Sequence, residues 1–372
     1  MRDLDVTKLL RRAGGMDRRT FIKSLGAGAV AGGAGFMALA TWAERAAAQS
    51  AGGQLVVGSW GGSTGALHKK YFFDPFTAAT GIKVIDVAPT SYGKLKSMVE
   101  AGAPEWDVTL LIDVGQAKRA ANEGLVEAID YSVVKADDLV PEARGSHWAA
   151  GEIETVLMGY RTDTFKDKHP TSWADFWNVE AFPGNRALHN WCVTTMEAAL
   201  LADGVEPGAL YPLDIDRAFA SLDKIKPHIK VWWDVSAQGT SQQLLKDHEV
   251  DILNGWTGRF GPLILGGDPI NMDYSQGLYT ISPWVAVKGA ANMQNAMLFL
   301  DFISRPEPQA ALHSELIYGP TNPKALALIK PEIAKLLPTD PENFKKTVSV
   351  DTDYWQANEA AVTERFTAWL LT

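Results

Sequence analysis

The stretch DILNGWTGRF, residues 251–260, places an indole and a guanidinium three positions apart, at Trp256 and Arg259. An apolar run leads into the Gly-Trp pair and a helical pattern follows, as expected where a buried strand ends and a helix begins. In open α/β sheets, ligands bind at such strand ends. Trp offers a flat apolar wall, and Arg offers a rigid fork for a planar anionic group. The same pair is also typical of a core Trp beside a surface Arg, so the rest of the chain has to decide between the two interpretations.

Residue patterns for catalysis or metal binding are not found after residue 48. That part of the sequence contains no G-x-S-x-G, H-E-x-x-H or paired-cysteine motif, and its seven histidines lack ligand spacing. The single cysteine, Cys192, excludes an internal disulfide and is interpreted as a packed thiol, not a nucleophile. We therefore expect a protein that is not an enzyme and that needs no cofactor or metal. The alternative is a hydrolase that uses a pair of carboxylates in a ligand cleft.

The elements that would position these side chains alternate between strands and helices. Residues 54–59 (QLVVGS) are an expected strand that ends at Trp60 and Gly61, and residues 107–112 (DVTLLI) are another that ends at Asp113. A helical pattern follows the first strand, so strand, Gly-rich turn and helix open an α/β unit. The backbone N–H groups of the turn are candidates for an anionic ligand end, although tight turns also need glycine for geometry alone.

The middle of the chain repeats this alternation. Expected strands end at Trp191, at Asp234 and at Trp256, within residues 251–260. Further expected elements are helices beginning at Ser172 and Asp214, strands over 270–273 and 279–287, helices over 292–303 and 358–370, and a rigid turn over 318–323. Near-continuous apolar runs are typical of buried parallel strands. The sequence therefore predicts an α/β fold with parallel-dominated sheets flanked by helices.

The first 48 residues have the organisation of an export leader. Arg18-Arg19 precedes a Gly/Ala-rich apolar run over residues 25–42, and Ala46-Ala47-Ala48 offers an A-x-A cleavage site before Gln49. The pattern resembles a twin-arginine signal, from which it departs at Asp17. A membrane anchor is the alternative, because the run approaches the ~20 residues that span a bilayer, but its glycines and alanines make it weakly hydrophobic. We expect cleavage near Gln49 and export of the folded protein to the periplasm.

Length and charge limit the partners. A chain of 372 residues is long for one hydrophobic core, which favours two lobes. Removal of residues 1–48 leaves 27 basic and 40 acidic side chains, a net charge of −13. Such a surface repels phosphate backbones and anionic lipid, so nucleic acid is not expected as a partner. We expect a soluble monomer that binds a small molecule.

Several short motifs, in their order and spacing, resemble the extracellular solute-binding proteins of ABC importers, specifically the spermidine/putrescine-binding group. The motifs are Trp60 after the first strand, residues 80–84 (TGIKV), residues 171–175 (TSWAD), Glu249-Val250 ahead of Trp256, Tyr318 with Pro320-Thr321, and residues 354–356 (YWQ). The resemblance implies a type II periplasmic binding protein fold, with a ligand cleft between two α/β lobes, and an ABC permease in the inner membrane as partner. The expected lobes are residues 54–156 with 257–305 and residues 157–256 with 306–372, closing by a hinge near Val156 and Trp256.

The resemblance also assigns individual residues. It places Trp60, Trp256 and Gln356 in the cleft, and Thr321 in the turn beside it. A carboxylate-bearing ligand with an amine at its other end would also need an acid. The candidates are Asp113, Asp234 and Asp273, although each is also typical of a capped or solvated turn.

The departures from polyamine binding are informative. The polyamine binders hold ammonium groups with carboxylates at three places, where this chain has Trp191, Thr194 and Ser282. A serine that follows the cleft Trp in that group is replaced by Arg259. Burying an unpaired ammonium beside an Arg costs several kcal/mol. We therefore expect a carboxylate-bearing amine or amino acid, such as an ω-amino acid, with a polyamine as the alternative.

Overall fold

The first strand-turn-helix pattern of the sequence forms as expected, since β1 (Gln54–Gly58) leads into α4 (Gly62–His68). The expected strand β3 (Val108–Leu110) also forms, and it leads into α7 (Val114–Asn122). The computed structural model describes residues 40–44, 46, 52–235, 237 and 239–372, so most of the expected leader, with Arg18 and Arg19, lies outside the described residues. The chain divides into unit 1, Met1–Ile153 with Ile281–Lys335, and unit 2, Glu154–Thr280 with Leu336–Thr372.

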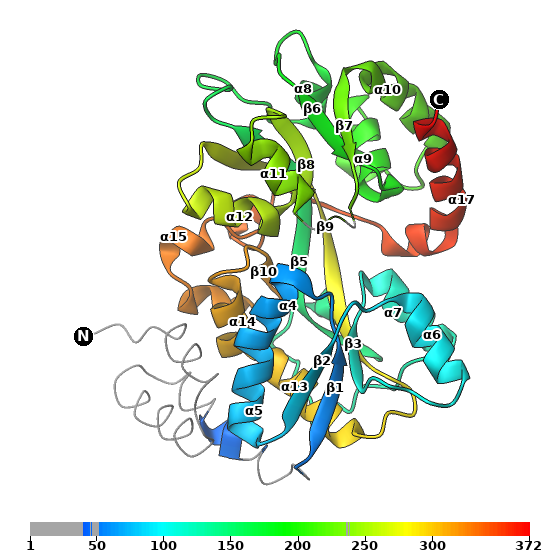
Figure 1. Ribbon diagram of the computed structural model, residues 1–372, viewed down its shortest axis with the longest axis vertical. Coiled ribbons are helices and arrows are strands. Elements are labelled where there is room, and N and C mark those ends of the chain that lie inside the picture. The colour runs from blue at the N-terminus through cyan, green and yellow to red at the C-terminus, as the bar shows by residue number, and fades with distance from the viewer. Residues whose placement is uncertain (1–39, 45, 47–51, 236, 238) are drawn as a thin grey trace, which may run out of the picture. The chain divides into compact units, whose positions relative to one another are not determined.

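Unit 1 is built on a mixed sheet (Figure 1). β2 (Lys83–Val87) and β3 pair in parallel with β1, and the second half of β9 (Ile270–Ala286) pairs antiparallel with β3. β10 (Gly319–Pro320) pairs antiparallel with the beginning of β5 (Trp148–Arg161). The helices of unit 1 include α4, α5 (Asp74–Thr80), α6 (Tyr92–Glu100), α7, α13 (Met293–Ile303), α14 (Pro306–His313) and α15 (Pro331–Ala334).

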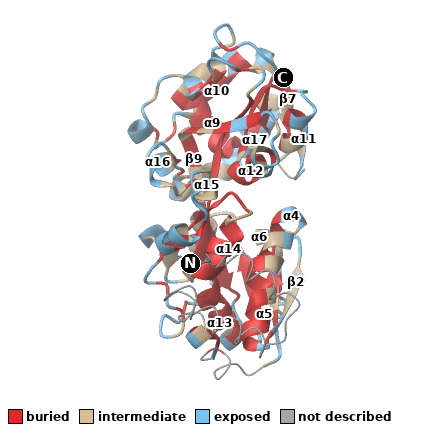
Figure 2. Cartoon of the chain, turned by 90° about the vertical axis from the view of Figure 1, so that its left-hand side faces the viewer, coloured by how far each residue is buried: buried red, intermediate tan, exposed pale blue. Residues whose placement is uncertain are grey.

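Aromatic side chains fill much of the core of unit 1. Phe299 of α13 meets Phe76 of α5 nearly edge to face, with ring centroids 5.4 Å apart, and meets Trp284 of β9 at 5.6 Å. α13 and α14 are buried over almost their whole length (Figure 2). This explains why the sequence of α13 is apolar on more than one side, as expected for a helix surrounded by protein.

Unit 2 also contains strands of mixed direction. β8 (Ile252–Trp256) pairs antiparallel with the second half of β5 and parallel with β6 (Arg186–His189), which pairs in parallel with β7 (Ile229–Trp233). β11 (Val348–Ser349) pairs in parallel with β9. Its helices include α8 (Trp173–Trp177), α9 (Cys192–Ala202), α10 (Ile215–Ile225), α11 (Thr240–Lys246), α12 (Thr257–Leu265), α16 (Pro341–Phe344) and α17 (Thr352–Leu370). The expected caps are confirmed, since Ser172 accepts from the Asp175 N–H and Asp214 accepts from the Arg217 N–H.

The strands expected over 270–273 and 279–287 form one strand, β9. Gly277 lies between the two expected strands, and glycine is a common turn residue. Its missing side chain instead allows close packing on β5, because a Cβ at this position would lie 2.9 Å from the Thr155 methyl group. Gln276 beside it adopts φ 59°, an irregularity that does not end the strand.

The division into units differs from the expected lobes. The chain passes from one unit to the other at Ile153–Glu154 in β5, at Thr280–Ile281 in β9 and at Lys335–Leu336. Residues 257–280 therefore belong to unit 2, because α12 follows β8 there, and residues 306–335 belong to unit 1, where β10 pairs with β5. The crossing that was expected near Trp256 lies within β9.

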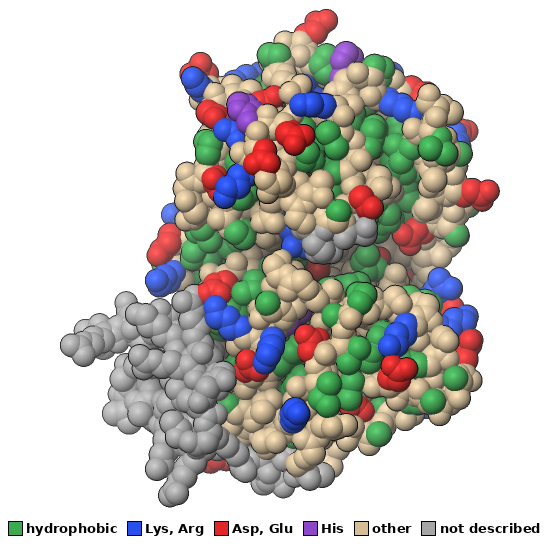
Figure 3. All heavy atoms as spheres, viewed as in Figure 1, with side chains coloured by type: hydrophobic (Ala, Val, Ile, Leu, Met, Phe, Trp, Pro, Cys, Tyr) green, Lys and Arg blue, Asp and Glu red, His purple; other side chains and the backbone are tan. Residues whose placement is uncertain are grey.

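The face of the molecule shown in Figure 3 carries hydrophobic side chains together with charged ones of both signs. On the face shown in Figure 3, acidic and basic side chains are interspersed over both units. No helix in the described part of the chain is both long and apolar enough to cross a membrane.

Candidate functional site

Three parallel strands of unit 2 end in aromatic residues. The register pairs His189 at the end of β6 with Trp233 at the end of β7, and β8 ends at Trp256. Because β6, β7 and β8 run in the same direction, these three residues meet at the carboxyl edge of the sheet, where α/β folds place their ligands. Trp191, two residues past β6, completes what we call the aromatic cluster.

The rings of the aromatic cluster are in contact. Trp256 lies nearly parallel to Trp191, with centroids 6.3 Å apart and 19° between the planes, and nearly parallel to His189 at 5.9 Å. Trp233 meets His189 and Trp256 edge to face at 5.6 and 6.1 Å. Trp233 and His189 are buried, whereas Trp191 and Trp256 are only half-buried. The half-buried pair is the part of the cluster that can contact a solute.

His189 contacts several residues at the carboxyl edge of the unit 2 strands. Its Nδ1 accepts a hydrogen bond from the Trp191 N–H at 3.3 Å, and its Nε2 lies 2.9 Å from the Thr194 hydroxyl. Nδ1 as acceptor leaves the imidazole proton on Nε2, where it can be donated to Thr194. Complete burial lowers the pKa of His189 to about 3. The imidazole is therefore neutral at physiological pH and positions Trp191 and Thr194 instead of transferring protons.

Arg259 lies in the first turn of α12, directly after the aromatic cluster. Trp256 is the residue before the helix and offers no side-chain cap, and Arg259 is half-buried. Two buried polar groups close to it in the sequence, the Asn254 amide nitrogen and the Thr257 hydroxyl, have no hydrogen-bond partner among the described residues. Because buried polar groups are nearly always paired, this edge is suited to a polar solute or water.

α17 packs against the loop that carries Trp191. The Trp191 indole N–H donates to Glu359 at 3.1 Å, and the Trp355 indole N–H donates to the buried carboxylate of Glu197 on α9 at 2.5 Å. Burial raises the pKa of Glu197. Gln356 is exposed and lies one helical turn before Glu359. α17 therefore sets the orientation of Trp191 and places Gln356 on the same helix.

The predicted residues of unit 1 gather at the carboxyl edge of its parallel strands. β1 and β3 are adjacent and parallel, so Trp60 and Asp113, which follow them, lie at the same edge. Ser282 of β9 donates to the carbonyl of Ile112, next to Asp113, at 3.2 Å. Asp113 accepts from the Gln116 N–H at 2.8 Å and so caps α7. Gly61 is required by the turn, since it has φ 73° and a Cβ there would lie 2.9 Å from the Ala88 Cβ.

Two candidate ligand-binding residues, Thr321 and Asp273, have hydrogen-bond partners within the protein. Thr321 is fully buried, donates to the Ala150 carbonyl and accepts from Gln309 at 3.0 Å, so it fixes β10 onto β5 and offers no exposed surface to a solute. Asp273 accepts from the Ser275 N–H at 2.7 Å and lies 3.2 Å from His169. Asp234 directly follows β7 and is exposed.

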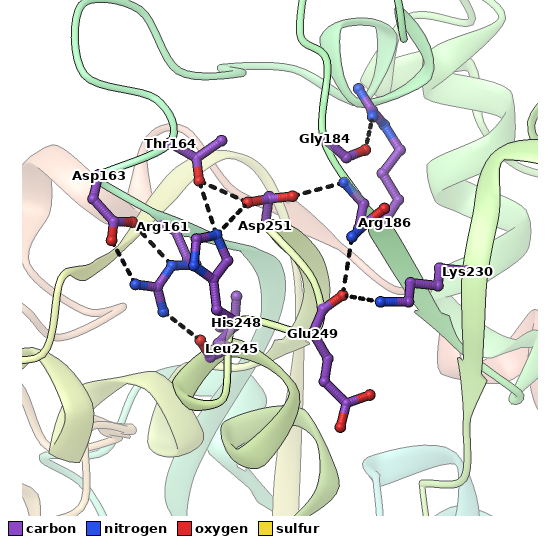
Figure 4. Close-up of polar contacts among 11 residues, drawn as sticks. Arg161, Asp163, Thr164, Gly184, Arg186, Lys230, Leu245, His248, Glu249 and Asp251 are labelled. Carbon is purple, nitrogen blue, oxygen red and sulfur yellow. Dashed lines mark hydrogen bonds and ion pairs between the residues drawn. The ribbon is translucent and has the colours of Figure 1, made fainter.

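A polar network lies at the opposite end of the unit 2 strands (Figure 4). Asp251, just before β8, accepts from the Thr164 hydroxyl at 2.6 Å, from the Asn185 N–H at 2.7 Å and from His248 Nε2 at 3.0 Å. A nucleophilic triad needs the carboxylate and the hydroxyl on different ring nitrogens. Here both contact Nε2 of His248, with the hydroxyl at 3.4 Å. The network therefore anchors the start of β8 and is not a catalytic relay.

Cys192 is buried, in agreement with its interpretation as a packed thiol. Its sulfur lies 3.2 Å from the Thr363 hydroxyl, and burial raises the pKa of the thiol to about 12. Within the described residues, no group of three His, Cys, Asp or Glu side chains is arranged to hold a metal ion.

Sequence reasoning missed His189, Trp233 and Glu359. The first two could have been found, because each ends a strand that was expected to run parallel to the Trp256 strand. Glu359 carries no local signal, since its contact with Trp191 joins residues 168 positions apart.

Comparisons with known proteins agree on one family, the bacterial extracellular solute-binding proteins. Residues 72–345 match the model of the bacterial extracellular solute-binding proteins. The chain is similar to the gamma-aminobutyric acid-binding protein of Pseudomonas aeruginosa, with 34% identity over 87% of this chain and 93% of the relative. It is 25% identical to the spermidine/putrescine-binding periplasmic protein of Escherichia coli, over 73% of this chain and 80% of the relative.

Solved structures agree with these matches. An ABC transporter substrate-binding protein from Bradyrhizobium japonicum superposes with a TM-score of 0.80 and 37% identity, over 86% of this chain and 99% of the other. The Atu4243 GABA receptor superposes with a TM-score of 0.79 and 36% identity, over 85% of this chain and 97% of the other.

Proposed function

This chain belongs to the family of bacterial extracellular solute-binding proteins, and from that premise we propose that its solute is a zwitterionic ω-amino acid of the size of γ-aminobutyric acid. It is the substrate-binding component of an ABC transporter, which captures a small molecule for a permease. The structural neighbours are type II periplasmic binding proteins, with mixed α/β architecture as in this chain. We further propose that it works as a monomer in the periplasm, because the expected export leader would deliver it there.

The observation that carries the ligand proposal is the pairing of Arg259 with the aromatic cluster in unit 2. β8 ends at Trp256, whose indole stacks on that of Trp191, and α12 begins at Thr257, so the guanidinium of Arg259 follows the strand that ends in this half-buried indole pair. A guanidinium binds a carboxylate with charge-assisted, bidentate hydrogen bonds, but repels an ammonium group. The positive end of the α12 dipole favours the same sign of ligand charge. A carboxylate therefore fits beside Arg259, and a diamine does not.

The relatives support this assignment. The relative of Pseudomonas aeruginosa named for gamma-aminobutyric acid is 34% identical, whereas the spermidine/putrescine-binding relative of Escherichia coli is 25% identical. The amine of the ligand is proposed to lie against the faces of Trp191 and Trp256, because indole faces attract ammonium groups by about 0.5–2 kcal/mol. Asp113 and Asp234 remain candidate acids for the amine, and Trp60, Ser282 and Gln356 remain candidate contacts.

Substitution of Arg259 tests the proposal. Arg259→Lys keeps the charge but loses the planar fork, so γ-aminobutyric acid should bind more weakly without loss of saturable binding. Arg259→Ala should weaken binding by about 2 kcal/mol or more, as is usual when one partner of a desolvated charge pair is removed. Isothermal titration calorimetry measures both changes. Arg217→Ala is the matched control, because Arg217 of unit 2 pairs with Asp203 on an exposed surface. Equal affinity in Arg259→Ala and Arg217→Ala would remove Arg259 from the site.

A further inference from the structure

A short helix from the expected leader is docked on unit 1. Residues 40–44 and 46 are helical and lie beside α5, as the short blue segment in Figure 1. Trp42, Ala43 and Ala46 are buried, while Thr41 and Glu44 are exposed. The buried positions share one face of a helix, so the segment packs on unit 1 as an amphipathic helix does.

Trp42 is the anchor of this docked helix. Its indole N–H donates to Asp301 at 2.5 Å, and its ring lies 4.9 Å from Phe302 and 6.4 Å from Phe76, measured between centroids. The guanidinium of Arg305 lies over the same ring at 5.2 Å. The indole is thus enclosed by two aromatic rings, a cation on its face and an acceptor for its only polar group.

The receiving pocket is built by unit 1 itself. Asp301 is 3% exposed, and it also accepts from the Lys135 N–H at 2.7 Å and from Arg305 at 2.9 Å. Asp301 and Phe302 belong to α13, and Phe76 belongs to α5. The Asp301 carboxylate is therefore positioned by Lys135 and Arg305, which lie outside the docked helix. We expect the pocket to keep this geometry when Trp42 is not bound.

The docked helix includes the first residue of the expected cleavage motif. Ala46 is 1% exposed and helical, whereas Ala47 and Ala48 lie outside the described residues. A leader peptidase has to reach the small residues of the A-x-A site. A residue that is packed in a helix against a folded unit is not accessible to it.

We propose that docking of Trp42 on unit 1 protects the leader from cleavage, so that processing requires the helix to leave its pocket. The reaction concerned is hydrolysis of the amide bond between Ala48 and Gln49 by a leader peptidase, with water as the co-reactant. It yields the carboxyl group of Ala48 and a free amine on Gln49. The docked and undocked states then compete, and the cleavage rate follows the undocked fraction. This inference rests on the expected leader and is independent of the proposed ligand.

Cleavage of the full chain by purified leader peptidase tests the proposal. Because burial of one large apolar side chain shifts a two-state equilibrium by about tenfold or more, Trp42→Ala should be cleaved at least about ten times faster than wild type. Glu44→Ala, an exposed position on the same helix, should be cleaved at the wild-type rate. Hydrogen exchange should show protection of residues 40–46 in wild type and its loss in Trp42→Ala. Equal cleavage rates for Trp42→Ala and Glu44→Ala, or no cleavage of either, would overturn the proposal.

Two controls separate docking from peptidase recognition. Peptides covering residues 30–55, with the wild-type sequence or with the Trp42→Ala substitution, cannot dock and should be cleaved at equal rates; a difference as large as in the full chain would overturn the proposal. Asp301→Asn changes the pocket at a residue outside the leader and should also accelerate cleavage, because the single amide oxygen of Asn cannot accept from both the Lys135 N–H and the Trp42 indole. An Asp301→Asn chain that keeps the circular dichroism spectrum of wild type but is cleaved no faster than wild type would contradict it.

Discussion

His189 shows how a buried residue shapes the proposed site without touching a solute. It lies under Trp256 and is bonded to the backbone of Trp191 and to the Thr194 hydroxyl. Since burial holds its pKa near 3, protonation would introduce an unpaired buried charge at the centre of the aromatic cluster. Both half-buried tryptophans therefore depend on a neutral imidazole.

This dependence predicts a pH effect on stability. The unfolded chain binds a proton to His189 below about pH 6.5, whereas the folded protein does so only near pH 3, so the contribution of His189 is intact above about pH 6.5 and declines toward pH 3. At pH 5 the decline amounts to about 2 kcal/mol. His189→Gln should lose less stability than wild type between pH 7 and pH 5 in thermal unfolding, with His228→Gln, an exposed site in unit 2, as control. Parallel curves for wild type and His189→Gln would contradict the prediction. Burial also lowers the pKa of His313, which acts in the same direction in both proteins.

At the residue scale, the sequence could predict those site residues that lie next to each other in the chain. Trp256 and Arg259 are three residues apart, and the strand-to-helix break between them is visible in the apolar pattern. Thr321 and Asp273 could not be judged in this way. Each has one partner more than 100 residues away, Ala150 for Thr321 and His169 for Asp273, and only the fold shows these two contacts.

Among the elements, α17 has the largest indirect role. It begins at Thr352, where Asp351 caps it by accepting from the Tyr354 N–H, and it extends to Leu370. Its carboxylate at Glu359 holds the Trp191 indole, and its indole at Trp355 is held by Glu197. α17 is therefore coupled to the Trp191 loop through Glu359 and to α9 through Trp355, at two points one helical turn apart.

Substitution of Glu359 separates a positioning role from an effect of charge. Glu359→Gln retains an oxygen that can accept from the Trp191 indole, so the affinity for γ-aminobutyric acid should stay near wild type. Glu359→Ala removes the acceptor and should weaken binding by about 1 kcal/mol, the usual contribution of one hydrogen bond. Titration calorimetry measures both variants, with Glu364→Ala, an exposed residue of the same helix, as control. If Glu359→Gln binds as weakly as Glu359→Ala, the charge of Glu359 and not its hydrogen bond is what matters.

Most elements were predictable where a local signal starts or ends them. α10 begins after Asp214 and α13 ends at Ile303, as the apolar spacing and caps indicated. α17 was predicted to begin at residue 358, six residues late, because its first turns expose several polar side chains and fully bury only Trp355. The continuity of β9 was missed because Gly277 is a turn signal in sequence and a close-packing residue in the structure.

For the whole molecule, the three connections between the units lead to a prediction about ligand binding. The family resemblance implies that a bound solute brings the lobes together, and the chain joins the units at residues 153–154, 280–281 and 335–336. We expect the radius of gyration in small-angle X-ray scattering to fall when γ-aminobutyric acid is added at saturation. Arg259→Ala at the same ligand concentration should show no change. Scattering curves that are identical with and without ligand, for a sample shown to be saturated, would contradict closure.

The two-unit organisation was predictable at this scale, but its exact bounds were not. Chain length and alternating strands and helices indicate two α/β lobes. The position of each crossing depends on which unit a strand pairs with, and β5 and β9 each pair in both. A strand that serves two units has no break in its sequence to mark the boundary.

The central claim is that this protein binds a zwitterionic ω-amino acid and not a diamine, and titration calorimetry of the wild-type protein tests it most directly. Purified protein is titrated with γ-aminobutyric acid and, separately, with putrescine, which differs from it in having a second ammonium group in place of the carboxylate. The account predicts saturable binding of γ-aminobutyric acid, lost in Arg259→Ala, and affinity for putrescine at least about 100-fold weaker, because the ammonium would be buried beside a guanidinium. Tight putrescine binding that Arg259→Ala leaves unchanged or improves would contradict it.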